Sequence, residues 1–164
     1  MEIRQAQLKD LDAIHAIEMA NFSEEEAMTK DVLADHIRTC RTSFLVAEDA
    51  GRILGYLEGP VVQTRHLQDA SFENVQDWSG QEAGFISITS LSIAPEAQSL
   101  GLGRTLLDAM KEVAVRDHRQ GINLTCHDYL IAYYEKHGFV NEGLSKSAYA
   151  GEVWYDMVWE NPKI

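Results

Sequence analysis

The chain is poor in cysteine and has no long apolar run. Cys40 and Cys126 are its only cysteines, too few for a disulfide framework, and free thiols are typical of a reducing, cytoplasmic setting. No apolar run approaches the roughly 20 residues that a membrane-spanning helix needs. The first residues, Met1 to Arg4, lack a basic patch followed by an apolar segment, so no signal peptide is expected. We therefore expect a cytoplasmic protein with no membrane partner.

Positive charge is also scarce. The 164 residues include 14 lysines and arginines against 26 aspartates and glutamates, which gives a formal net charge of −12. Binding to nucleic acid depends on basic side chains that neutralise phosphates, so no nucleic-acid partner is expected. An acidic protein attracts cationic substrates such as amines, although solubility alone explains the same composition.

What is present fits one globular domain. Apolar residues make up 45% of the chain, which argues against disorder, and we expect residues 1–164 to form a single domain with one core. Alternating or apolar segments predict strands at residues 3–7, 43–48, 53–58, 85–93, 122–126, 140–144 and 153–158. Helical spacing follows Asp10 and Thr29, which are expected caps, and recurs at 102–114 and 127–137. This order predicts an α/β (α+β) fold, with a mixed sheet of about seven strands and helices on both faces.

Residues 61–84 are polar and show little periodicity. We expect a long surface connection there, with a helical turn near residues 68–75. A connection of this length inside a compact domain is usually functional or disordered.

A glycine-bearing turn between the strand at 85–93 and the helix at 102–114 has the features of a phosphate site. The segment reads Gln98-Ser99-Leu100-Gly101-Leu102-Gly103 and is followed by Arg104. Amides in the first turn of a helix have no partner within the helix, the helix dipole adds partial positive charge, and glycine lets a pyrophosphate approach the backbone. The spacing fits neither the dinucleotide-binding Gly-x-Gly-x-x-Gly motif nor a Walker loop. An ordinary loop that enters a core helix is the alternative.

This turn resembles the pyrophosphate loop of the GNAT superfamily of N-acetyltransferases, Gln/Arg-x-x-Gly-x-Gly/Ala after a strand. A second segment, Ala132 to Phe139, is similar to that family's other signature, a helix end of the form Tyr-x-x-x-Gly-Phe. Nearly the whole chain looks like the serotonin (arylalkylamine) N-acetyltransferase branch. The likeness includes residues 17–27, the hairpin at 51–56, Cys126 with Asp128, and the spacing from Gly138-Phe139 to Asp156-Met157.

The resemblance implies acetyl-CoA as co-substrate and no metal. It implies that the strand at 85–93 splays from the strand at 122–126, and that the pantetheine arm lies in the wedge between them. The cofactor contacts that it implies are backbone groups of Leu91, Ser92 and Ile93, the loop residues Gln98, Ser99, Leu100, Gly101, Leu102, Gly103 and Arg104, and Tyr134. The Leu91 amide would lie near the thioester oxygen, where a preplaced N–H stabilises the negative charge that develops when an amine attacks.

Tyr134 matches the tyrosine with which the resembling enzymes protonate the departing thiolate. A phenol has an ordinary pKa of about 10, so it stays protonated at neutral pH and can donate. Packing alone is the alternative role. The adjacent Tyr133 lies roughly 100° round the helix and is the weaker candidate.

The chain departs from the serotonin-type enzymes in one respect. Those enzymes place two histidines, two residues apart, on the central strand, and Ser87 and Thr89 occupy these positions here. Hydroxyls can hold water molecules but cannot act as a base at neutral pH. Either a water chain along Ser87 and Thr89 carries the amine's proton away, or His127 or Glu26 replaces the histidine pair. For His127, a surface position beside Asp128 is the alternative.

The acceptor pocket that the resemblance implies is walled by Phe22 and Trp154, although buried aromatic side chains also simply pack. Glu26 belongs to a run of three glutamates that forms either a solvated surface or a lip that attracts an amine. We expect acetyl transfer to the primary amine of a small molecule, with an arylalkylamine as the example, by direct attack in a ternary complex. A protein N-terminal or lysine acetyltransferase of the same fold and a non-catalytic acyl-CoA-binding module are the alternatives. Either a monomer or a homodimer fits this expectation.

Overall fold

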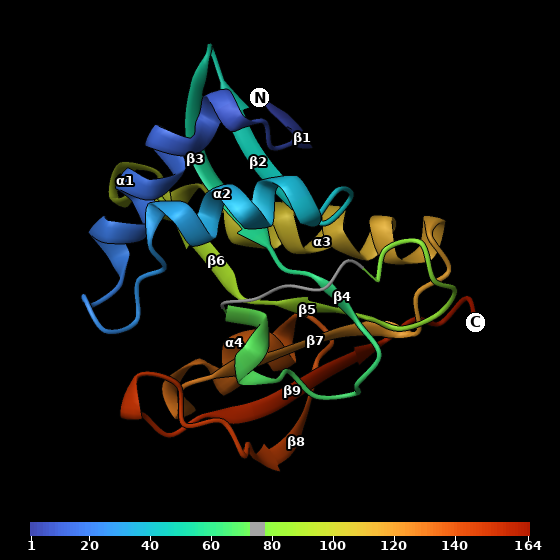
Figure 1. Cartoon of the computed structure of the whole chain (residues 1–164). Coiled ribbons are helices and arrows are strands. Elements are labelled where there is room, and N and C mark those ends of the chain that lie inside the picture. Colours follow the sequence, from blue (N-terminus) through green and yellow to red (C-terminus); the bar gives the residue numbers. More distant parts are fainter. Residues whose placement is uncertain (73–77) are drawn as a thin grey trace.

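A computed structural model describes residues 1–72 and 78–164 and arranges them in two sheets (Figure 1). Within these residues the strand order is β1-β2-β3-β6 in the first sheet and β4-β5-β7-β9-β8 in the second. The strands are β1 Glu2–Gln5, β2 Phe44–Asp49, β3 Arg52–Glu58, β4 Val61–Val62, β5 Phe85–Ile88, β6 Ser90–Ile93, β7 Gly121–Cys126, β8 Val140–Leu144 and β9 Tyr155–Glu160. The helices are α1 Leu11–Asn21, α2 Lys30–Thr39, α3 Leu102–Arg116 and α4 Ile131–Lys136. The expected α+β architecture is confirmed. The additional strands are β4 and the second half of the divided strand at 85–93.

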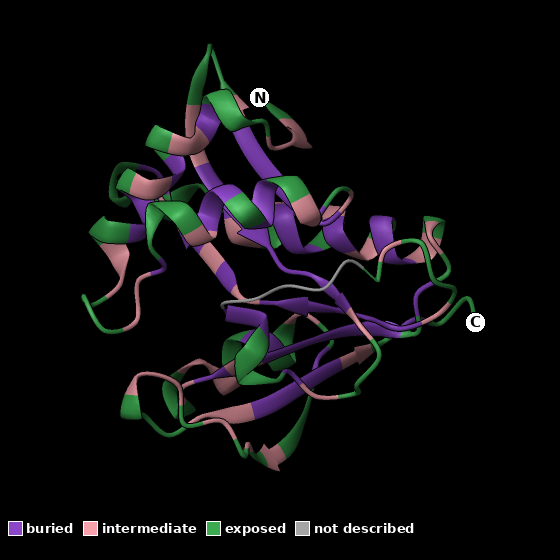
Figure 2. Ribbon diagram, in the orientation of Figure 1, coloured by how far each residue is buried: buried purple, intermediate pink, exposed green. Residues whose placement is uncertain are grey.

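Alternation along β2 divides the apolar side chains of the first sheet between its two faces. Leu45 and Ala47 belong to one buried cluster, together with Leu106 of α3. Phe44 and Val46 belong to the other, which includes apolar side chains of α1 and α2. Successive side chains of a strand point to opposite faces, so this strand contributes to both clusters. Helices α1 and α2 therefore cover one face and α3 the other, and the buried positions concentrate on the strands and the inner sides of these helices (Figures 1 and 2).

The expected helix caps are confirmed for α2 and wrong for α1. The Thr29 side chain accepts a hydrogen bond from the Val32 amide at 3.3 Å, which makes it the N-cap of α2. Asp10 makes no cap bond to α1. Its carboxylate instead accepts two hydrogen bonds from Arg4 at 2.8 and 2.9 Å and one from the Gln7 amide at 2.8 Å. Because the Arg4 guanidinium is the stronger donor, Asp10 fastens β1 to the start of α1.

The second sheet carries the C-terminal part of the chain. β5 runs parallel to β7, and β7 runs antiparallel to β9. The helix expected at 127–137 is shorter, because a 3₁₀ turn occupies residues 128–130 and α4 begins at Ile131. The last strand begins at Tyr155, so Trp154 lies in the loop just before it and not in the strand. Tyr134 of α4 packs into the cluster that contains Leu124 of β7.

The strand expected at 85–93 divides at Thr89, and this division separates the two sheets. β5 pairs with β7 as far as Ile88, whereas β6 pairs with β3 from Ser90 onward. The Thr89 amide also donates to the carbonyl of Glu58 at 2.9 Å, so two residues oppose one, as in a β-bulge. A bulge bends its strand, and β6 therefore leaves β7 beyond Ile88. The implied splay is thus present as a wedge between β6 and the end of β7.

The described parts of the connection between residues 61 and 84 contact the second sheet. β4 pairs with β5, and Asp69–Phe72 forms a 3₁₀ helix where a helical turn was expected. Residues 73–75 of that expected turn lie outside the described residues. Arg65 donates two hydrogen bonds to Glu142 of β8, at 2.9 and 2.6 Å. Asp69 accepts a hydrogen bond from the amide of Ala148 at 3.2 Å, so the C-terminal part of the chain holds this connection at two places.

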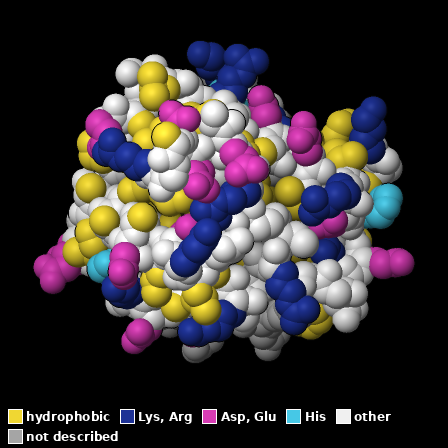
Figure 3. Space-filling view, turned by 90° about the horizontal axis from the view of Figure 1, so that it is seen from above, with side chains coloured by type: hydrophobic (Ala, Val, Ile, Leu, Met, Phe, Trp, Pro, Cys, Tyr) yellow, Lys and Arg dark blue, Asp and Glu magenta, His cyan; other side chains and the backbone are white. Residues whose placement is uncertain are grey.

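Acidic and basic side chains are interspersed on the face of the molecule shown in Figure 3. The negative excess is therefore not gathered into one patch on this face. Across residues 1–72 and 78–164, none of the helices combines the length and the apolar character that crossing a bilayer requires.

Candidate active site

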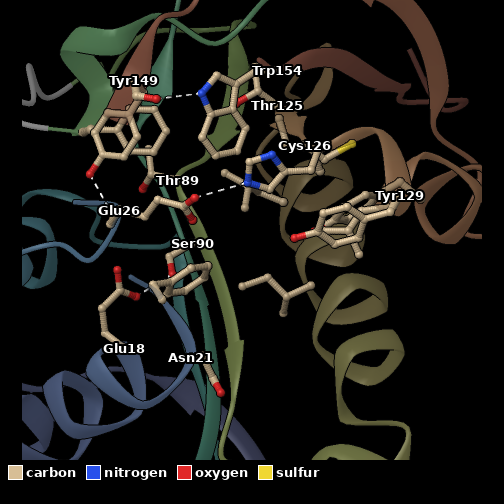
Figure 4. A pocket seen from close by; sticks show the side chains of 18 residues that line it. Glu18, Asn21, Glu26, Thr89, Ser90, Thr125, Cys126, Tyr129, Tyr149 and Trp154 are labelled. Carbon is tan, nitrogen blue, oxygen red and sulfur yellow. Dashed lines mark hydrogen bonds and ion pairs between the residues drawn. The ribbon is translucent and has the colours of Figure 1, made fainter. Parts of the chain in front are cut away.

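A pocket of about 180 Å³ lies where β6 leaves β7 (Figure 4). One wall comes from α1 and the loop after it, and the opposite wall comes from the end of β7 and from α4. The break at Thr89 lies between these walls. The pocket brings together residues that the sequence singled out separately, namely Phe22, Glu26, Thr89, Leu91, His127, Tyr134 and Trp154.

The backbone of β6 presents the Leu91 amide to the wedge. Gly55 pairs with Ile93, and the Ala94 amide donates to the carbonyl of Leu54 at 2.8 Å. Hydrogen bonding in an antiparallel pair alternates between successive residues, so Ser92 exchanges bonds with β3 while Leu91 directs its amide to the opposite edge. Among the described residues β6 is the last strand of its sheet. The Leu91 amide therefore has the orientation that the resemblance implied for stabilising a thioester oxygen.

Several of the expected cofactor residues have partners within the protein. The Ile93 carbonyl accepts hydrogen bonds from the side-chain amides of Asn21 at 2.6 Å and Gln98 at 3.2 Å. The Ser92 hydroxyl accepts a hydrogen bond from Asn21 at 2.7 Å, and its backbone faces β3. Asn21, which the sequence did not single out, thus joins α1 to β6 and to the loop that follows. Ser92, the Ile93 carbonyl and the Gln98 side chain hold this arrangement in place.

The expected phosphate loop begins with exposed residues and ends at the first turn of α3. Ser99 and Leu100 lie in a 3₁₀ helix that spans residues 95–100, and both are exposed. Gly101 follows with a φ of 74°, a left-handed conformation that glycine adopts without steric cost. The first hydrogen bond of the helix runs from the Thr105 amide to the Gly101 carbonyl, at 3.2 Å. The amides of residues 102–104 therefore have no acceptor within the helix and are available to an anion.

Gly103 and Arg104 complete this loop. Gly103 lies so close to the Tyr133 hydroxyl that a Cβ at this position would overlap it. The Arg104 side chain is 75% exposed and lies 3.8 Å from Asp108. The loop therefore offers backbone amides, one cation and the hydroxyl of a tyrosine from α4.

Tyr134 of α4 lines the pocket. Its side chain is buried, with 8% exposure, and burial raises its pKa above the ordinary value. No residue in the described part of the chain accepts a hydrogen bond from its hydroxyl. Tyr134 thus keeps its proton at neutral pH and has it free to donate.

His127 and Glu26 face each other across the pocket. His127 Nε2 lies 3.3 Å from Glu26 Oε1, and the two side chains are only 19% and 17% exposed. The imidazole stacks on Trp154, with ring centroids 4.3 Å apart, and on Tyr129 at 5.4 Å. The 3₁₀ turn after β7 therefore places His127 in the site and not on an open surface.

Aromatic side chains from the loop between β8 and β9 and from the 3₁₀ helix at 69–72 cover the pocket, and Figure 4 labels two of them, Tyr149 and Trp154. The Tyr149 hydroxyl donates to the Glu26 carbonyl at 3.0 Å, and the Trp154 indole donates to the Tyr149 carbonyl at 2.9 Å. Phe72 stacks on Tyr149 with ring centroids 4.0 Å apart. The segments that carry Glu26, Phe72 and Tyr149 thus meet over the site, and two of these aromatic residues, Phe72 and Tyr149, were missed by the sequence analysis.

The division at Thr89 separates Ser87 from the pocket. Ser87 is fully buried, and its hydroxyl donates to the side chain of Asn123. Thr89 lines the pocket, and its hydroxyl donates to the carboxylate of Glu58. Positions two apart share a face only in an unbroken strand, and the bulge interrupts that pattern. The expectation that both hydroxyls line one water chain is therefore wrong for Ser87.

Glu18 is a lining residue that the sequence analysis did not name. It is 2% exposed and accepts hydrogen bonds from the Met28 amide and the Ser90 hydroxyl, both at 2.8 Å, and from the Tyr56 hydroxyl. Burial raises the pKa of this carboxyl. An acidic residue on the apolar side of α1, next to Ile17, was the signal available in the sequence.

Solved structures share this fold across nearly the whole chain. Ard1 from Thermoplasma volcanium has a TM-score of 0.74 and 20% identity over 97% of this chain and 96% of that one. The GphF GNAT-like decarboxylase in complex with isobutyryl-CoA has a TM-score of 0.83 and 16% identity over 98% and 100%. Naa20 from Chaetomium thermophilum, in complex with a bisubstrate analogue, has a TM-score of 0.72 and 19% identity over 99% and 88%. At these identities the likeness concerns the fold alone.

A family model matches most of the chain. No curated protein sequence matches the chain. The model of the acetyltransferase (GNAT) family matches residues 11–139, a range that contains the phosphate loop, His127 and Tyr134. The chain therefore belongs to the GNAT acetyltransferase family and is an N-acetyltransferase of the kind that uses acyl-CoA.

Proposed function

We propose that this enzyme transfers an acetyl group from acetyl-CoA to the primary amine of a small molecule, in the manner of the arylalkylamine branch of the family. The observation that carries the proposal is the pair formed by His127 and Glu26, which faces the same pocket as Tyr134. A base and an acid that face one pocket are what amine acetylation needs. Phe22, Tyr149 and Trp154 surround this pair with aromatic surface that suits an arylalkyl group.

His127 and Glu26 supply a base for the amine. Because Nε2 of His127 is directed at Glu26, Nδ1 is the nitrogen whose lone pair is left to accept a proton. The N–H bond of the ammonium breaks as Nδ1 takes the proton, and the carboxylate of Glu26 stabilises the imidazolium that results. The freed amine lone pair then forms the bond to the acetyl carbon.

Leu91 and Tyr134 act on the acetyl group and on the leaving thiolate. The Leu91 amide stabilises the negative charge on the carbonyl oxygen, and the carbon–sulfur bond breaks as the amide product forms. Tyr134 gives its proton to the departing sulfur and is reprotonated, through water, by the second proton that leaves the nitrogen as the amide forms. Two protons thus leave the ammonium nitrogen: one ends on the thiol by way of Tyr134, and the other passes from His127 to solvent, so the net reaction is balanced.

Cys126 lines the pocket but is unsuited to carry the acetyl group. Burial raises the pKa of its thiol to about 11, so the thiolate, which is the nucleophilic form, is scarce at neutral pH. A route through an acetylated cysteine would need that thiolate. Direct attack by the amine, with both substrates bound together, is the simpler route in this pocket.

The closure of the pocket favours a small acceptor over an extended peptide. The hydrogen bond between Tyr149 and Glu26 and the stack of Phe72 on Tyr149 join loops that an open peptide groove would keep apart. A pocket of about 180 Å³ is small, which suits a compact amine better than an extended peptide.

A panel of acceptors tests this proposal. The rate of free-thiol release from acetyl-CoA would be measured with arylalkylamines, aliphatic amines, lysine-containing peptides and peptides with free N-termini. We expect kcat/KM for the best arylalkylamine to exceed that of any peptide by about 100-fold, because a peptide must open the contacts over the site. A preference for peptide N-termini would replace the small-molecule proposal with protein acetylation. Thiol release that no acceptor stimulates would favour a binding module.

A further inference from the structure

A buried pair of His36 and Glu58 lies behind the acceptor pocket and takes no part in the proposed transfer steps. His36 belongs to α2, Glu58 is the last residue of β3, and both side chains are fully buried. His36 Nδ1 lies 2.6 Å from Glu58 Oε2. Neither residue lines the pocket, so any effect that the pair has on the acceptor must pass through another side chain.

The stability of the fold does not account for this pair. His36 Nε2 is buried and has no hydrogen-bond partner in the described part of the chain, and an unsatisfied nitrogen in the interior lowers stability. Moving the Glu58 carboxylate out of water also costs free energy, which the attraction of one partner often only offsets. The pair is better explained by the group that it holds in place.

Glu58 connects the pair to the pocket through Thr89. The Thr89 hydroxyl donates to Glu58 Oε1 and lies 3.4 Å from the Glu58 carbonyl, and the Thr89 amide donates to the same carbonyl at 2.9 Å. His36 occupies the other carboxylate oxygen. A carboxylate accepts hydrogen bonds and donates none, so His36 and Thr89 each direct a proton at Glu58.

This arrangement restricts Thr89 to one role on its pocket side. A threonine hydroxyl has one proton to donate and two lone pairs that accept. The proton is directed at Glu58, while the side chain lines the pocket, where Figure 4 labels it. The pocket thus meets an oxygen that can accept a hydrogen bond and has no proton left to donate.

We propose that the Thr89 oxygen accepts a hydrogen bond from the nitrogen of the acceptor, and that Glu58, itself held by His36, is the positioning residue that keeps the threonine proton turned away. The proposal rests on the amine acetylation of the proposed function. A primary ammonium that loses one proton keeps two N–H bonds, so one can be directed at Thr89 while the lone pair faces the acetyl carbon. An alcohol that loses its proton keeps no such bond. Thr89 therefore favours transfer to nitrogen over transfer to oxygen.

A double-mutant cycle of Thr89→Val and Glu58→Gln tests this proposal. Valine keeps the shape of threonine without the hydroxyl, whereas the glutamine amide can donate to Thr89 and turn the threonine proton towards the pocket. We expect each single change to lower kcat/KM for the best acceptor of the panel by about tenfold, the effect of one hydrogen bond, with KM for acetyl-CoA nearly unchanged. In the Thr89→Val background, Glu58→Gln should have little further effect, because the group that it positions is gone.

Further variants serve as controls. Thr89→Ser keeps the hydroxyl and should retain most of the activity. Thr64→Val removes an exposed hydroxyl outside the pocket and should leave kcat/KM unchanged. Thermal unfolding shows which variants are folded. If Glu58→Gln does not fold, Glu58→Asp, which keeps the charge but withdraws it from Thr89, takes its place in the cycle.

The outcomes separate this proposal from the proposed function. An unchanged kcat/KM in folded Thr89→Val would overturn the role of Thr89 and leave acetyl transfer to the amine intact. Losses that simply add in the double variant would overturn the positioning role of Glu58, because Glu58 would then act independently of Thr89. If the wild type acetylates no acceptor, the proposed function fails and this proposal fails with it.

Discussion

At the scale of single residues, two adjacent tyrosines of α4 serve different parts of the site. Tyr134 is 8% exposed and lines the acceptor pocket, whereas Tyr133 is 37% exposed and contacts Gly103 of the phosphate loop. Neighbouring residues on a helix point roughly 100° apart, which explains the separation. The sequence motif alone favoured Tyr134, and its burial now gives a physical reason.

Tyr134→Phe removes one proton donor and almost no volume. We expect kcat to fall by about 10²- to 10⁴-fold, the usual contribution of a general acid, with KM for acetyl-CoA nearly unchanged. Steady-state kinetics at saturating amine measure this effect. Tyr133→Phe is the control and should leave kcat within about threefold of wild type, because its hydroxyl lies at the loop. Loss of kcat in Tyr133→Phe alone would reverse the two assignments.

Cys126→Ser tests direct attack. Because burial raises the pKa of the thiol to about 11, Cys126 should remain a thiol, and the variant should keep kcat within about threefold of wild type. Mass spectrometry of wild-type enzyme mixed with acetyl-CoA alone should show no covalent acetyl adduct. An adduct that disappears in Cys126→Ser would instead show that the acetyl group passes through the protein.

At the scale of elements, the phosphate loop depends on a left-handed residue at its centre. Gly101→Val puts a branched side chain at a φ of 74°, so the loop must change its path and its amides lose their alignment. We expect KM for acetyl-CoA to rise by about tenfold or more, since several amide contacts are lost together. Gly51→Val is the matched control, at a φ of 80° and also in open space, but in the hairpin between β2 and β3. Equal KM values in the two variants would contradict the assignment of the loop.

The contact of the 61–84 connection with β8 should weaken in acid. Arg65 and His66 lower the pKa of Glu142 from 4.5 to about 2. A lowered pKa stabilises the folded state above pH 4.5, and this stabilisation is lost as the pH falls towards about 2. Since Arg65 is 43% exposed, solvent screening limits the contribution to about 1 kcal/mol.

Glu142→Gln should therefore lower the free energy of unfolding by about that amount at pH 7 and have little effect near pH 2, because the wild-type protein has lost most of this stabilisation once the pH reaches the lowered pKa of Glu142. Urea denaturation at both pH values measures the difference. Glu160→Gln changes the more exposed carboxylate that also approaches Arg65, at 3.4 Å, and should have a smaller effect. A loss that is the same at pH 7 and pH 2 would show that packing, not charge, is responsible.

The order and type of most elements could be predicted from local patterns. Thr29 marked the start of α2 correctly, and glycine and apolar spacing located α3. The failures lie where a long-range partner prevails over a local preference. Asp10 binds Arg4 of β1 instead of capping α1, and the Thr89 amide binds Glu58 of β3, which divides a strand that reads as continuous.

At the scale of the whole molecule, the site assembles residues that are distant in sequence. Glu26 and His127 are 101 positions apart and meet only because α1 and the end of β7 form opposite walls of one wedge. The sequence could name both as candidates for the missing base, but not place them together. Conversely, Ser87 and Thr89 are only two positions apart, but the bulge directs the Thr89 side chain to the pocket and leaves Ser87 buried beside Asn123. Tyr149 could not be identified locally, because its role depends on contacts with Glu26 and Phe72 in other segments.

The central claim, that His127 paired with Glu26 accepts the amine's proton in this pocket, is tested most directly by the pH dependence of kcat/KM. For wild type and for the control Ser87→Ala, whose hydroxyl lies outside the pocket, we expect the same pH profile of kcat/KM, because both keep His127. In His127→Gln, kcat/KM should fall by about 10²- to 10⁴-fold at neutral pH and continue to rise towards the pKa of the free amine, about 10.4 for an alkylamine. A wild-type profile that still climbs at about pH 9 and does not change in His127→Gln would contradict the claim.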